Sequence, residues 1–483
     1  MKKPPLQSAE TTRALCVDLD GTLVATDTLW ESFLILMKTA PHRVLSLLFV
    51  LLGGRPKLKR YLSTHAPVDP RALPYREEVL ELTRNARQAG RPIILVTAAD
   101  QATAAAVAAH VDVFDEAVGS DGRHNLKAQR KADFLASRFG RGGFQYVGDA
   151  AADLPVWKAA GDAIIVAPSP RTRRRAEQAV SSVTVVSERP NKWLAAMKEL
   201  RPHQWAKNLL LFVPLYFAHA YDDWWRVFSV VMAFFSFSLC ASSIYILNDL
   251  VDLPADRRHR TKRKRPLASG TLAIPEGLLL MVFSLASSLL LATSFVNLQF
   301  VWVVLGYIAL TTFYTFYLKR RLIVDVLALA LLFTYRVMAG SVAAQVELSF
   351  WLLAFSIFFF TSLAFVKRYS ELIQLRRNDE HALRGRNYVL ADVPLVTSIG
   401  PASGLLAVLV FALYINSPSI QRYYSTPQAL WGICLILMYW VTRVWFLAAR
   451  GEMHDDPVLF AVRDKVSLFS GALALGCLLA ARL

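Results

Sequence analysis

The chain has 483 residues, of which 54% are hydrophobic and 19% are charged, and its formal net charge is +17. This length exceeds that of one typical domain. In a soluble protein such a charge would suggest a nucleic-acid partner. Here the basic residues concentrate in loops between apolar segments, as in membrane proteins, so we expect a membrane and no nucleic acid.

Apolar residues divide the chain into two parts. Up to about residue 200 they alternate with polar, Gly- and Asp-bearing segments, whereas long uncharged segments dominate after about residue 208. We expect a soluble domain followed by a membrane domain, without a cleavable signal peptide because the N-terminus is basic and polar. The four cysteines have neither disulfide nor metal-site spacing and are expected to be inert packing residues: Cys16, Cys240, Cys434 and Cys477.

Short apolar, partly β-branched runs of the first part end near residues 17, 96 and 148, and helical patterns lie between them. This alternation predicts a Rossmann-like α/β domain, in which ligands bind at the carboxyl ends of the strands. Each run is followed by carboxylate or hydroxyl side chains: Asp18 and Asp20 with Gly21 and Thr22, then Thr97, then Asp149 and Asp153.

With Lys131, these residues resemble the four motifs of haloacid-dehalogenase-type phosphatases, over roughly residues 11–185. The resemblance implies that Asp18 is the nucleophile and Asp20 the general acid/base, while Thr97 and Lys131 hold the phosphoryl group. A carboxylate can accept a phosphoryl group when magnesium and a lysine offset the repulsion between the anions. The implied Mg²⁺ ligands are Asp18, Asp20, Asp149 and Asp153.

Two alternatives stay open for this domain. Lys127 could replace Lys131, although Lys131 begins an amphipathic pattern and so belongs to a helix N-terminus. The domain could also be a former phosphatase that now serves as a scaffold, a regulatory module or an anchor, although every chemical position is occupied.

Residues 27–78 lie where such phosphatases often carry a cap. The stretch 29–53 is unusually apolar, but polar or helix-breaking residues interrupt it at 38 and 41–43. We expect a helical cap, a hairpin that covers the active site and dips into the membrane surface; the alternative is a cap packed on its own core. Residues 186–206 predict a linker and an interfacial helix before the membrane domain at 207–483.

A helix needs about 20 mostly apolar residues to cross a membrane. Basic residues concentrate in loops 249–275, 318–322 and 367–398, which are every second loop, so we place these loops and the N-terminal domain in the cytoplasm. The prediction is an all-α bundle of nine transmembrane helices, the first being the weakest: 207–222, 227–248, 276–295, 299–317, 323–341, 349–366, 399–416, 427–447 and 463–481.

The stretch 248–270 places acidic and then basic side chains at the end of an apolar run. Three carboxylates within two helical turns repel one another unless a cation lies between them. The basic residues that follow suit an anionic ligand, so the stretch predicts a divalent metal with a polyphosphate. Its polar residues are Asn248, Asp249, Asp252 and Asp256, then His259, Lys262 and Arg265.

A second group of ionisable residues, Lys319, Asp325 and Arg336, lies in or beside a later membrane segment. An ionisable group there is costly and indicates function by default. The alternative is a pair of snorkelling basic residues with an aspartate at a helix start. The expected position of stretch 248–270 on the same face of the membrane favours the functional interpretation.

The pattern Asn-Asp-x-x-Asp-x-x-x-Asp-x-x-His-x-x-Lys-x-x-Arg-Pro-Leu-Ala-Ser-Gly at 248–270 resembles the first signature of the UbiA superfamily of intramembrane prenyltransferases. The resemblance covers roughly residues 195–483. It implies a helical bundle with a central cavity open to lipid, and Asp-rich loops that hold magnesium and a diphosphate. Two stretches, Arg-Pro-His-Gln-Trp-Ala-Lys-Asn at 201–208 and Leu-Lys-Arg-Arg-Leu-Ile-Val-Asp at 318–325, are similar to decaprenyl-phosphate phosphoribosyltransferases.

That branch implies phosphoribosyl pyrophosphate as donor and a polyprenyl phosphate as acceptor. Mg²⁺ on Asp249, Asp252 and Asp256, with Asn248 as a neutral ligand, would neutralise the departing pyrophosphate. Asp325 would add metal or ribose contacts. The residues expected to bind substrate are Lys207, Asn248, His259, Lys262, Arg265, Lys319, Arg336, Lys367 and Arg368. Arg384 and Arg386 are weaker candidates, and a positive-inside bias is the alternative for the later cations.

Because the two predicted domains share one chain, we expect them to catalyse two successive reactions. The bundle would transfer 5-phosphoribose to the lipid, and the phosphatase domain would remove the ribose 5-phosphate, giving a lipid-linked pentose for envelope glycans. The alternative is prenyl transfer from a polyprenyl diphosphate to an aromatic acceptor, with the N-terminal domain as an independent phosphatase or a regulatory module.

Overall fold

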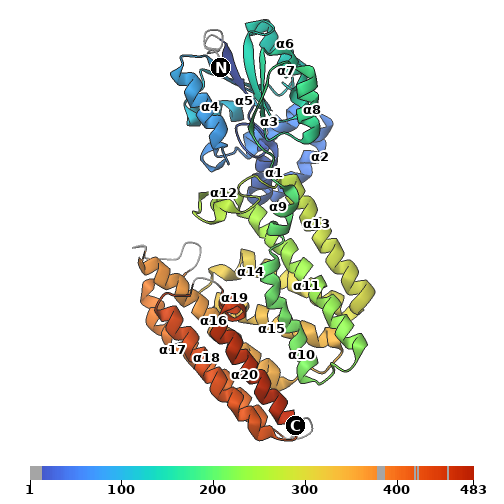
Figure 1. The fold of residues 1–483 in the computed structure, drawn as a ribbon, viewed down its shortest axis with the longest axis vertical. Coiled ribbons are helices and arrows are strands. Elements are labelled where there is room, and N and C mark those ends of the chain that lie inside the picture. The colour runs from blue at the N-terminus through green and yellow to red at the C-terminus, as the bar shows by residue number, and fades with distance from the viewer. Residues whose placement is uncertain (1–12, 378–386, 418–419, 421–423, 454–455, 483) are drawn as a thin grey trace, which may run out of the picture. The chain divides into compact units, whose positions relative to one another are not determined.

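The computed structural model describes residues 13–377, 387–417, 420, 424–453 and 456–482. The chain forms two compact units (Figure 1). The first unit contains Met1–Leu200 together with Tyr245–Leu280, and the second contains Arg201–Ile244 with Met281–Leu483. The stretch 248–270 therefore belongs to the first unit. The domain boundaries at residues 185 and 207 stay a prediction.

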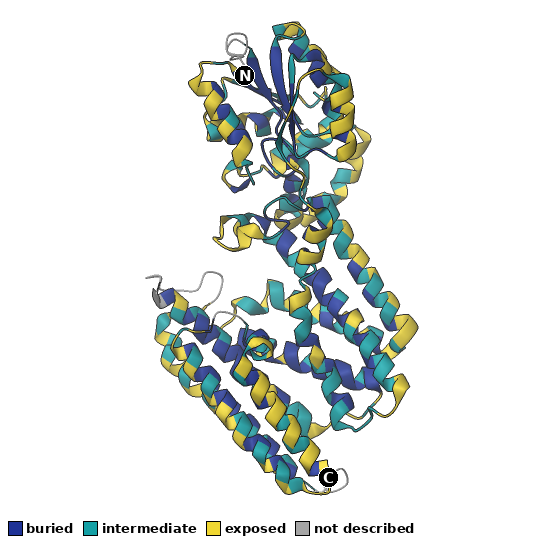
Figure 2. Cartoon of the chain, in the orientation of Figure 1, coloured by how far each residue is buried: buried dark blue, intermediate teal, exposed yellow. Residues whose placement is uncertain are grey.

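A six-stranded parallel sheet lies at the centre of the first unit, with the order β3-β2-β1-β4-β5-β6. Its strands β1, β2 and β4 are almost wholly buried (Figure 2). In β1, Cys16 pairs with Ile94 of β2 and with Tyr146 of β4, so the strand order reverses on either side of β1. The strands are β1 (Ala14–Val17), β2 (Ile93–Asp100), β3 (Glu116–Ser120), β4 (Phe144–Gly148), β5 (Asp162–Val166) and β6 (Val183–Ser187).

Helices cover both faces of this sheet, which explains why its strands read as continuous apolar runs. Leu15 and Val17 pack in one core with α4 (Glu77–Gln88) and α5 (Gln101–Val111). Cys16 faces the other core, which includes residues of α6 (Gln129–Phe139), α7 (Leu154–Ala159) and α8 (Pro170–Ala179). The Rossmann-like α/β prediction is confirmed. The sheet directs the carboxyl ends of β1 and β4 to one edge, at the point where the strand order reverses.

The predicted cap consists of α1 (Thr28–Thr39), α2 (Val44–Leu52) and α3 (Arg55–His65), with short 3-10 turns beside them. It has a small core of its own, around Leu36 and Leu62. Five large apolar side chains of α2 nevertheless stay exposed: Leu45, Leu48, Phe49, Leu51 and Leu52. After the sheet, α9 (Lys192–Glu199) follows at the position of the predicted interfacial helix, with exposed Trp193 and Leu194.

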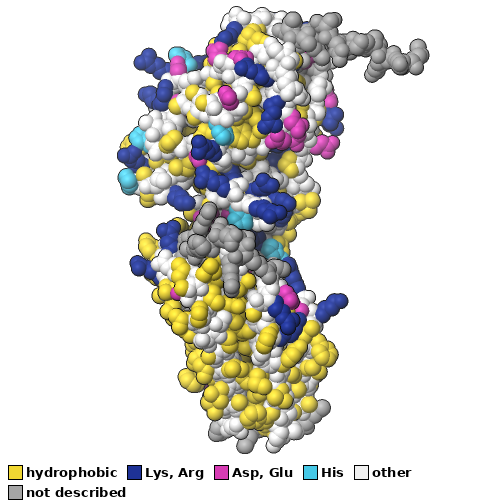
Figure 3. Space-filling model, turned by 90° about the vertical axis from the view of Figure 1, so that its left-hand side faces the viewer, with side chains coloured by type: hydrophobic (Ala, Val, Ile, Leu, Met, Phe, Trp, Pro, Cys, Tyr) yellow, Lys and Arg dark blue, Asp and Glu magenta, His cyan; other side chains and the backbone are white. Residues whose placement is uncertain are grey.

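Eight helices in the described part of the chain are long and apolar enough to cross a membrane. The buried helix α15 carries Asp325 and Arg336 and packs against α14 and α16. The eight are α11 (Trp224–Val251), α13 (Ile274–Leu291), α14 (Leu298–Phe316), α15 (Val324–Ala344), α16 (Phe350–Arg377), α17 (Val393–Ile415), α18 (Trp431–Ala449) and α20 (Lys465–Arg482). On the face shown in Figure 3, the helices of the second unit present mostly hydrophobic side chains.

The prediction of nine membrane-spanning helices is not confirmed, because the first candidate, 207–222, is not one long helix. Its residues belong to a 3-10 helix, Pro202–Leu211, and to the short helix α10 (Phe212–Phe217). Pro214 lies within α10 and lacks a backbone N–H, and six residues are far short of the roughly 20 that a span needs. The other eight predicted spans each coincide with one of the eight helices.

Candidate active sites

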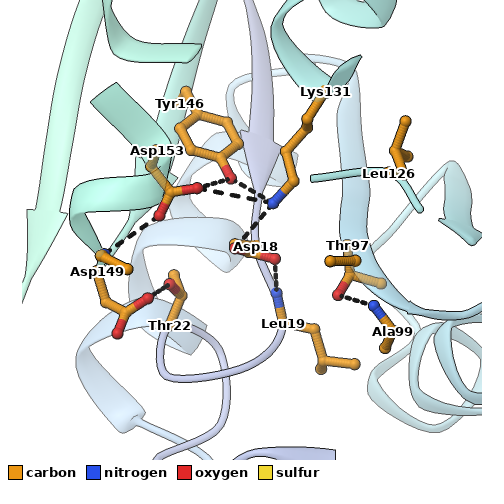
Figure 4. Close-up of polar contacts among 12 residues, drawn as sticks. Asp18, Leu19, Thr22, Thr97, Ala99, Leu126, Lys131, Tyr146, Asp149 and Asp153 are labelled. Atoms are coloured by element: carbon orange, nitrogen blue, oxygen red, sulfur yellow. Dashed lines mark hydrogen bonds and ion pairs between the residues drawn. The ribbon is translucent and has the colours of Figure 1, made fainter. Parts of the chain in front are cut away.

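The carboxyl end of β1 carries a buried nucleophile candidate, Asp18 (Figure 4). Its Oδ2 lies 2.8 Å from Nζ of Lys131, which the first turn of α6 delivers and whose side chain is only 2% exposed. Lys131 donates to the hydroxyl of Tyr146 (2.7 Å), and Tyr146 donates to Oδ1 of Asp153 (3.0 Å). Burial alone would lower the pKa of Lys131, but Asp18 and Asp153 outweigh it and raise that pKa. The lysine therefore stays charged beside the nucleophile candidate.

Asp18, Asp149 and Asp153 each offer an oxygen within 4.8 Å of the others, which makes them a candidate metal site. Burial, together with the neighbouring carboxylates Asp153 and Asp18, raises the pKa of Asp149 to about 7. The positive charge of Arg76 acts on Asp149, but it does not outweigh burial and the other carboxylates, so the cluster still favours a further cation. Because Mg²⁺ prefers carboxylate oxygens, the residues present fit this ion.

Gly21 makes the close approach to Asp149 possible. It has a left-handed φ of +76°, and a Cβ at this position would lie 2.3 Å from Oδ2 of Asp149. Thr22, the next residue, donates its hydroxyl to Asp149 Oδ1 (3.4 Å). The turn after Asp20 thus holds one carboxylate of the cluster in place.

The carboxylate of Asp20, the fourth predicted metal ligand, lies outside the three-carboxylate cluster. It accepts a hydrogen bond from the backbone N–H of Thr28 (2.8 Å) at the start of the cap helix α1. Burial, together with the charges of Asp27 and Asp18, raises the pKa of Asp20 to about 7, although the hydrogen bond from Thr28 lowers it in part. A carboxyl group with such a pKa can both give and take a proton near neutral pH, as a general acid/base must.

The remaining predicted phosphatase residues also lie at this edge of the sheet. Thr97, near the end of β2, is fully buried, and its Oγ1 accepts from the N–H of Ala99 (3.0 Å). Lys127 is exposed, so the geometry favours Lys131 for the lysine role. Lys59 of the cap lines a small cavity with Asp20, and burial lowers the pKa of Lys59.

In the stretch 248–270, hereafter the acidic loop, one guanidinium bridges two of the three aspartates. Nη1 of Arg265 lies 2.9 Å from Asp249 Oδ1 and also forms a close ion pair with Asp256. Lys262 lies 3.7 Å from Asp256. Burial raises the pKa of Asp256, and these two cations only partly offset that effect. Within the described residues, the half-buried Asp252 forms no ion pair, and the loop aspartates do not form a second cluster of three ligands within 4.8 Å.

The positions of Asp249 and Asp256 around Arg265 indicate how the acidic loop could bind magnesium. Mg²⁺ is commonly bound by one or two carboxylates plus substrate phosphates, rather than by a cage made of protein alone. Asp249 and Asp256 already converge on one cation, so they fit that mode of binding. His259 is exposed, and its Nδ1 is an acceptor for the backbone N–H groups of Thr261 and Lys262, so it shapes the turn.

In the second unit, Asp325 is fully buried and paired with Arg368. Arg368 Nε lies 2.6 Å from Asp325 Oδ2, and the Tyr388 hydroxyl donates to Asp325 Oδ1 (2.9 Å). Arg368 also binds Glu371 (2.5 Å). The structure thus brings Asp325 and Arg368 to each other.

Arg336 lies buried on α15 among neutral partners. It donates to Asn208 Oδ1 (3.0 Å), to the Leu332 carbonyl (2.5 Å) and to the Tyr307 hydroxyl (2.7 Å). Within the described residues no carboxylate pairs with its guanidinium, so its hydrogen-bond partners there are neutral. Lys319, in the short turn before α15, is half-buried.

Lys207 and Lys367 share one carboxylate that the sequence did not single out. Oδ2 of Asp456 lies 2.9 Å from Lys207 Nζ and 3.4 Å from Lys367 Nζ. Burial would raise the pKa of Asp456, but Lys367 and Lys207 outweigh it and lower that pKa. Arg384 and Arg386 lie outside the described residues.

A mostly apolar cavity of about 1140 Å³ lies in the second unit. Its walls include Ala206, Leu363 and Val458, which lie one, four and two residues from Lys207, Lys367 and Asp456 in the chain. Aromatic side chains form much of its remaining lining, among them Phe355, Phe359 and Trp440. The lysine pair therefore lies beside a cavity large enough for a lipid chain.

Residues 209–469 match the model of the UbiA prenyltransferase family, which is more than half of the chain. The chain belongs to this family. The uncharacterized protein y4nM of Sinorhizobium fredii is 40% identical over 461 residues, or 95% of this chain and 89% of that protein. A decaprenyl-phosphate phosphoribosyltransferase of Mycolicibacterium smegmatis is 41% identical over 282 residues, or 56% of this chain and 86% of that enzyme. A HAD family hydrolase of Salmonella enterica serovar Typhi has a TM-score of 0.27 at 15% identity, covering 36% of this chain and 67% of that chain.

The match with y4nM covers 95% of this UbiA protein, so y4nM aligns with both its N-terminal domain and its membrane part. Sequence reasoning missed Tyr146, Lys59 and Asp456. Tyr146 lies inside a motif that was recognised, but as a strand residue it reads as core. Lys59 and Asp456 have no motif around them, and only the folded chain brings them to Asp20 and to Lys207.

Proposed function

We propose that this UbiA protein transfers 5-phosphoribose from phosphoribosyl pyrophosphate to a polyprenyl phosphate, and that its N-terminal domain then removes the ribose 5-phosphate. The observation that carries the proposal is the Asp18–Lys131 pair with its carboxylate cluster, in a chain whose membrane part is 41% identical to a decaprenyl-phosphate phosphoribosyltransferase. When a phosphatase and a transferase belong to one chain, and the transferase makes a phosphorylated lipid, that lipid is a natural substrate for the phosphatase.

The acidic loop is the proposed donor site. Transfer breaks the bond between ribose C1 and the pyrophosphate oxygen and forms a bond from C1 to an oxygen of the lipid phosphate. When bound, Mg²⁺ would offset the negative charge of the departing pyrophosphate. Arg265 can exchange carboxylate oxygens for phosphate oxygens, and the exposed Lys262 can bind the same group. Asp252 and Asn248 are proposed as further ligands, and Lys319 as a further phosphate contact.

The lysine pair is the proposed acceptor site. Lys207 and Lys367 would hold the lipid phosphate, with Asp456 as the carboxylate that it displaces, and the neighbouring cavity would take the isoprenoid chain. The guanidinium of Arg336 inside the bundle supports anion binding there. Asp325 and Arg368 would act together as a buried pair that fixes α15 against α16.

In the phosphatase step, Asp18 Oδ attacks phosphorus and the bond to ribose O5 breaks. Asp20, with its raised pKa, donates a proton to the leaving O5 and then takes one from the water that hydrolyses the aspartyl phosphate. Lys131 offsets the repulsion between Asp18 and the phosphoryl group. Mg²⁺ on Asp18, Asp149 and Asp153 would add charge compensation. Thr97 is a proposed phosphoryl contact.

The covalent link between the domains raises the effective concentration of one site at the other. Hydrolysis of the first product would also draw the transfer forward. We place the acidic loop and the phosphatase domain in the cytoplasm, because the basic loops lie on alternate connections and because Arg257 of the loop pairs with Glu31 of the cap. This placement requires the segment 202–217 to cross the membrane as well as α11, although it is not one long helix. The exposed apolar side of α2 would lie in the membrane surface.

The deciding experiment incubates the pure protein with Mg²⁺, a polyprenyl phosphate and phosphoribosyl pyrophosphate labelled in the ribose. We expect label in the lipid phase, and mass spectrometry should detect the lipid-linked pentose. If label enters the lipid only from a labelled prenyl diphosphate and an aromatic acceptor, the chain is an aromatic prenyltransferase instead. A matched reaction with Asp249→Asn should leave the lipid unlabelled.

A further inference from the structure

One arginine of the acidic loop lies inside the phosphatase cap. Arg257, on α12 (Leu253–Arg258), has its Nη2 2.6 Å from Oε1 of Glu31. It also donates from Nη1 to the Ala72 carbonyl (3.1 Å) and from Nε to the Ala268 carbonyl (3.0 Å). The two charged side chains are only 6% and 4% exposed. All three nitrogens of the guanidinium therefore have partners, which is the condition under which a buried ion pair holds one geometry.

Glu31 belongs to the turn of the cap that also holds Asp20. It lies in the first turn of α1, and its Oε1 accepts a second hydrogen bond from the Thr26 hydroxyl (2.6 Å). Thr28, at the start of the same turn, donates its N–H to Asp20. One helical turn thus contacts the general acid/base candidate of the phosphatase and the arginine of the acidic loop.

The loop meets the cap at other points too. Gly270 has a left-handed φ of +73°, and a Cβ there would lie 2.0 Å from the Ala25 carbonyl oxygen, so the loop backbone packs directly on residue 25. Lys38 of α1 donates to the carbonyl of Val251 (3.0 Å). These contacts lie on both sides of Asp256, the neighbour of Arg257 and the partner of Arg265. The cap therefore supports the loop that carries the proposed donor site.

We propose that Glu31 of the phosphatase cap is a positioning residue for the transferase, acting through Arg257 on the acidic loop. The phosphatase domain is then a structural part of the donor site, and its role extends beyond acting on the product. This inference rests on the proposed function, since it assigns the donor to the acidic loop. An exposed ion pair between α12 and a later part of the cap region, Arg258–Asp69 (2.5 Å), provides the contrast, because exposed pairs contribute little.

The test measures transfer from labelled phosphoribosyl pyrophosphate by the full-length protein in detergent. Glu31→Gln keeps the size of the side chain but leaves Arg257 buried without a counter-charge. We expect the KM for phosphoribosyl pyrophosphate to rise by about 10-fold or more, with the KM for polyprenyl phosphate unchanged within about 2-fold. Asp69→Asn, the matched control, should change neither value by more than about 2-fold.

Further variants and outcomes test the inference and separate it from the proposed function. The double variant Glu31→Gln, Arg257→Gln should recover part of the affinity for the donor, because it removes the uncompensated charge. If Glu31→Gln does not fold, Arg257→Lys keeps the charge but loses the guanidinium fork, and it should raise the same KM. An unchanged donor KM in folded Glu31→Gln, or an equal rise in both KM values, overturns the inference but leaves the proposed function standing. Absence of label transfer by the wild type would overturn the proposed function itself.

Discussion

Carboxylates gather at two places in the first unit, and the two places differ in how nearby cations balance their negative charge. At the carboxyl ends of β1 and β4, Lys131 pairs with two of three clustered carboxylates, while burial and mutual repulsion raise the pKa of the third, Asp149, to about 7 despite the charge of Arg76. In the acidic loop, Arg265 lies between Asp249 and Asp256, and Lys262 lies nearby. The first site is short of positive charge before any ligand binds, whereas the second already has a cation in place.

This difference indicates when each site takes up magnesium. A site short of positive charge binds a divalent cation by itself. A site whose carboxylates are already paired gains a cation only when an anionic ligand arrives to occupy Arg265 and Lys262. We therefore expect Mg²⁺ in the phosphatase site at all times, and in the acidic loop only together with the diphosphate.

The largest expected effect follows from removing Asp18, the proposed nucleophile of the first site. Asp18→Asn should lower phosphate release by at least about 10³-fold, because the covalent route is lost. Transfer should continue, so the phosphorylated lipid should accumulate in mass spectra. Asp133→Asn, an exposed carboxylate on α6 that binds Gln129, is the matched control and should release phosphate normally. If wild type and Asp18→Asn accumulate the intermediate equally, the two activities are not coupled.

The sequence was most informative where function is carried by consecutive residues at the end of a strand. Asp18, Asp149 and Asp153 could be placed because parallel strands bring their carboxyl ends together. Tyr146 escaped notice because an aromatic residue in a strand is usually core. The side chain of Asp20 points to Thr28 rather than into the cluster, a direction that depends on how the cap is seated.

Membrane residues could be found from their charge, but their partners could not. Lys207 and Asp456 lie 249 residues apart, and nothing local in the sequence links them. Arg265 could be recognised as a phosphate-binding candidate, but its bridge between two aspartates depends on the fold of the loop. The span predicted at 207–222 is not confirmed as one long helix, because composition alone does not indicate that these residues divide between a 3-10 helix and the short α10 with its Pro214.

The second prediction concerns the cation of the acidic loop. Arg265→Ala should lower transfer by about 10²-fold, because it removes a contact to the departing pyrophosphate. It should also leave Asp249 and Asp256 without their bridging cation, so the loop should gain Mg²⁺ binding that does not need substrate. Calorimetric titration of Mg²⁺ would detect this extra site. Arg263→Ala, an exposed arginine of the same loop, should retain wild-type behaviour in both measurements.

The smallest expected effect is a pH dependence of stabilisation by magnesium. The pKa of Asp149 is raised from 3.8 to about 7 in the folded chain, so the folded state holds more protons than the unfolded state between these values. Stability without metal should therefore fall as the pH rises from about 4 to about 7. Mg²⁺ binds the ionised carboxylates, so its stabilising effect should be small near pH 5 and grow to about 3 kcal/mol near pH 8 at 100 times its Kd.

Thermal unfolding of the full-length protein in detergent, with and without Mg²⁺, measures this dependence. Asp149→Asn should abolish most of it, since the variant side chain does not ionise. Asp249→Asn should leave it unchanged, because the acidic loop is expected to take up Mg²⁺ only with a diphosphate. An equal stabilisation near pH 5 and pH 8, or a loss of the effect in Asp249→Asn rather than in Asp149→Asn, would reverse the assignment of the two sites. The acidic loop, rather than the cluster around Asp149, would then be the group that binds Mg²⁺ without a substrate.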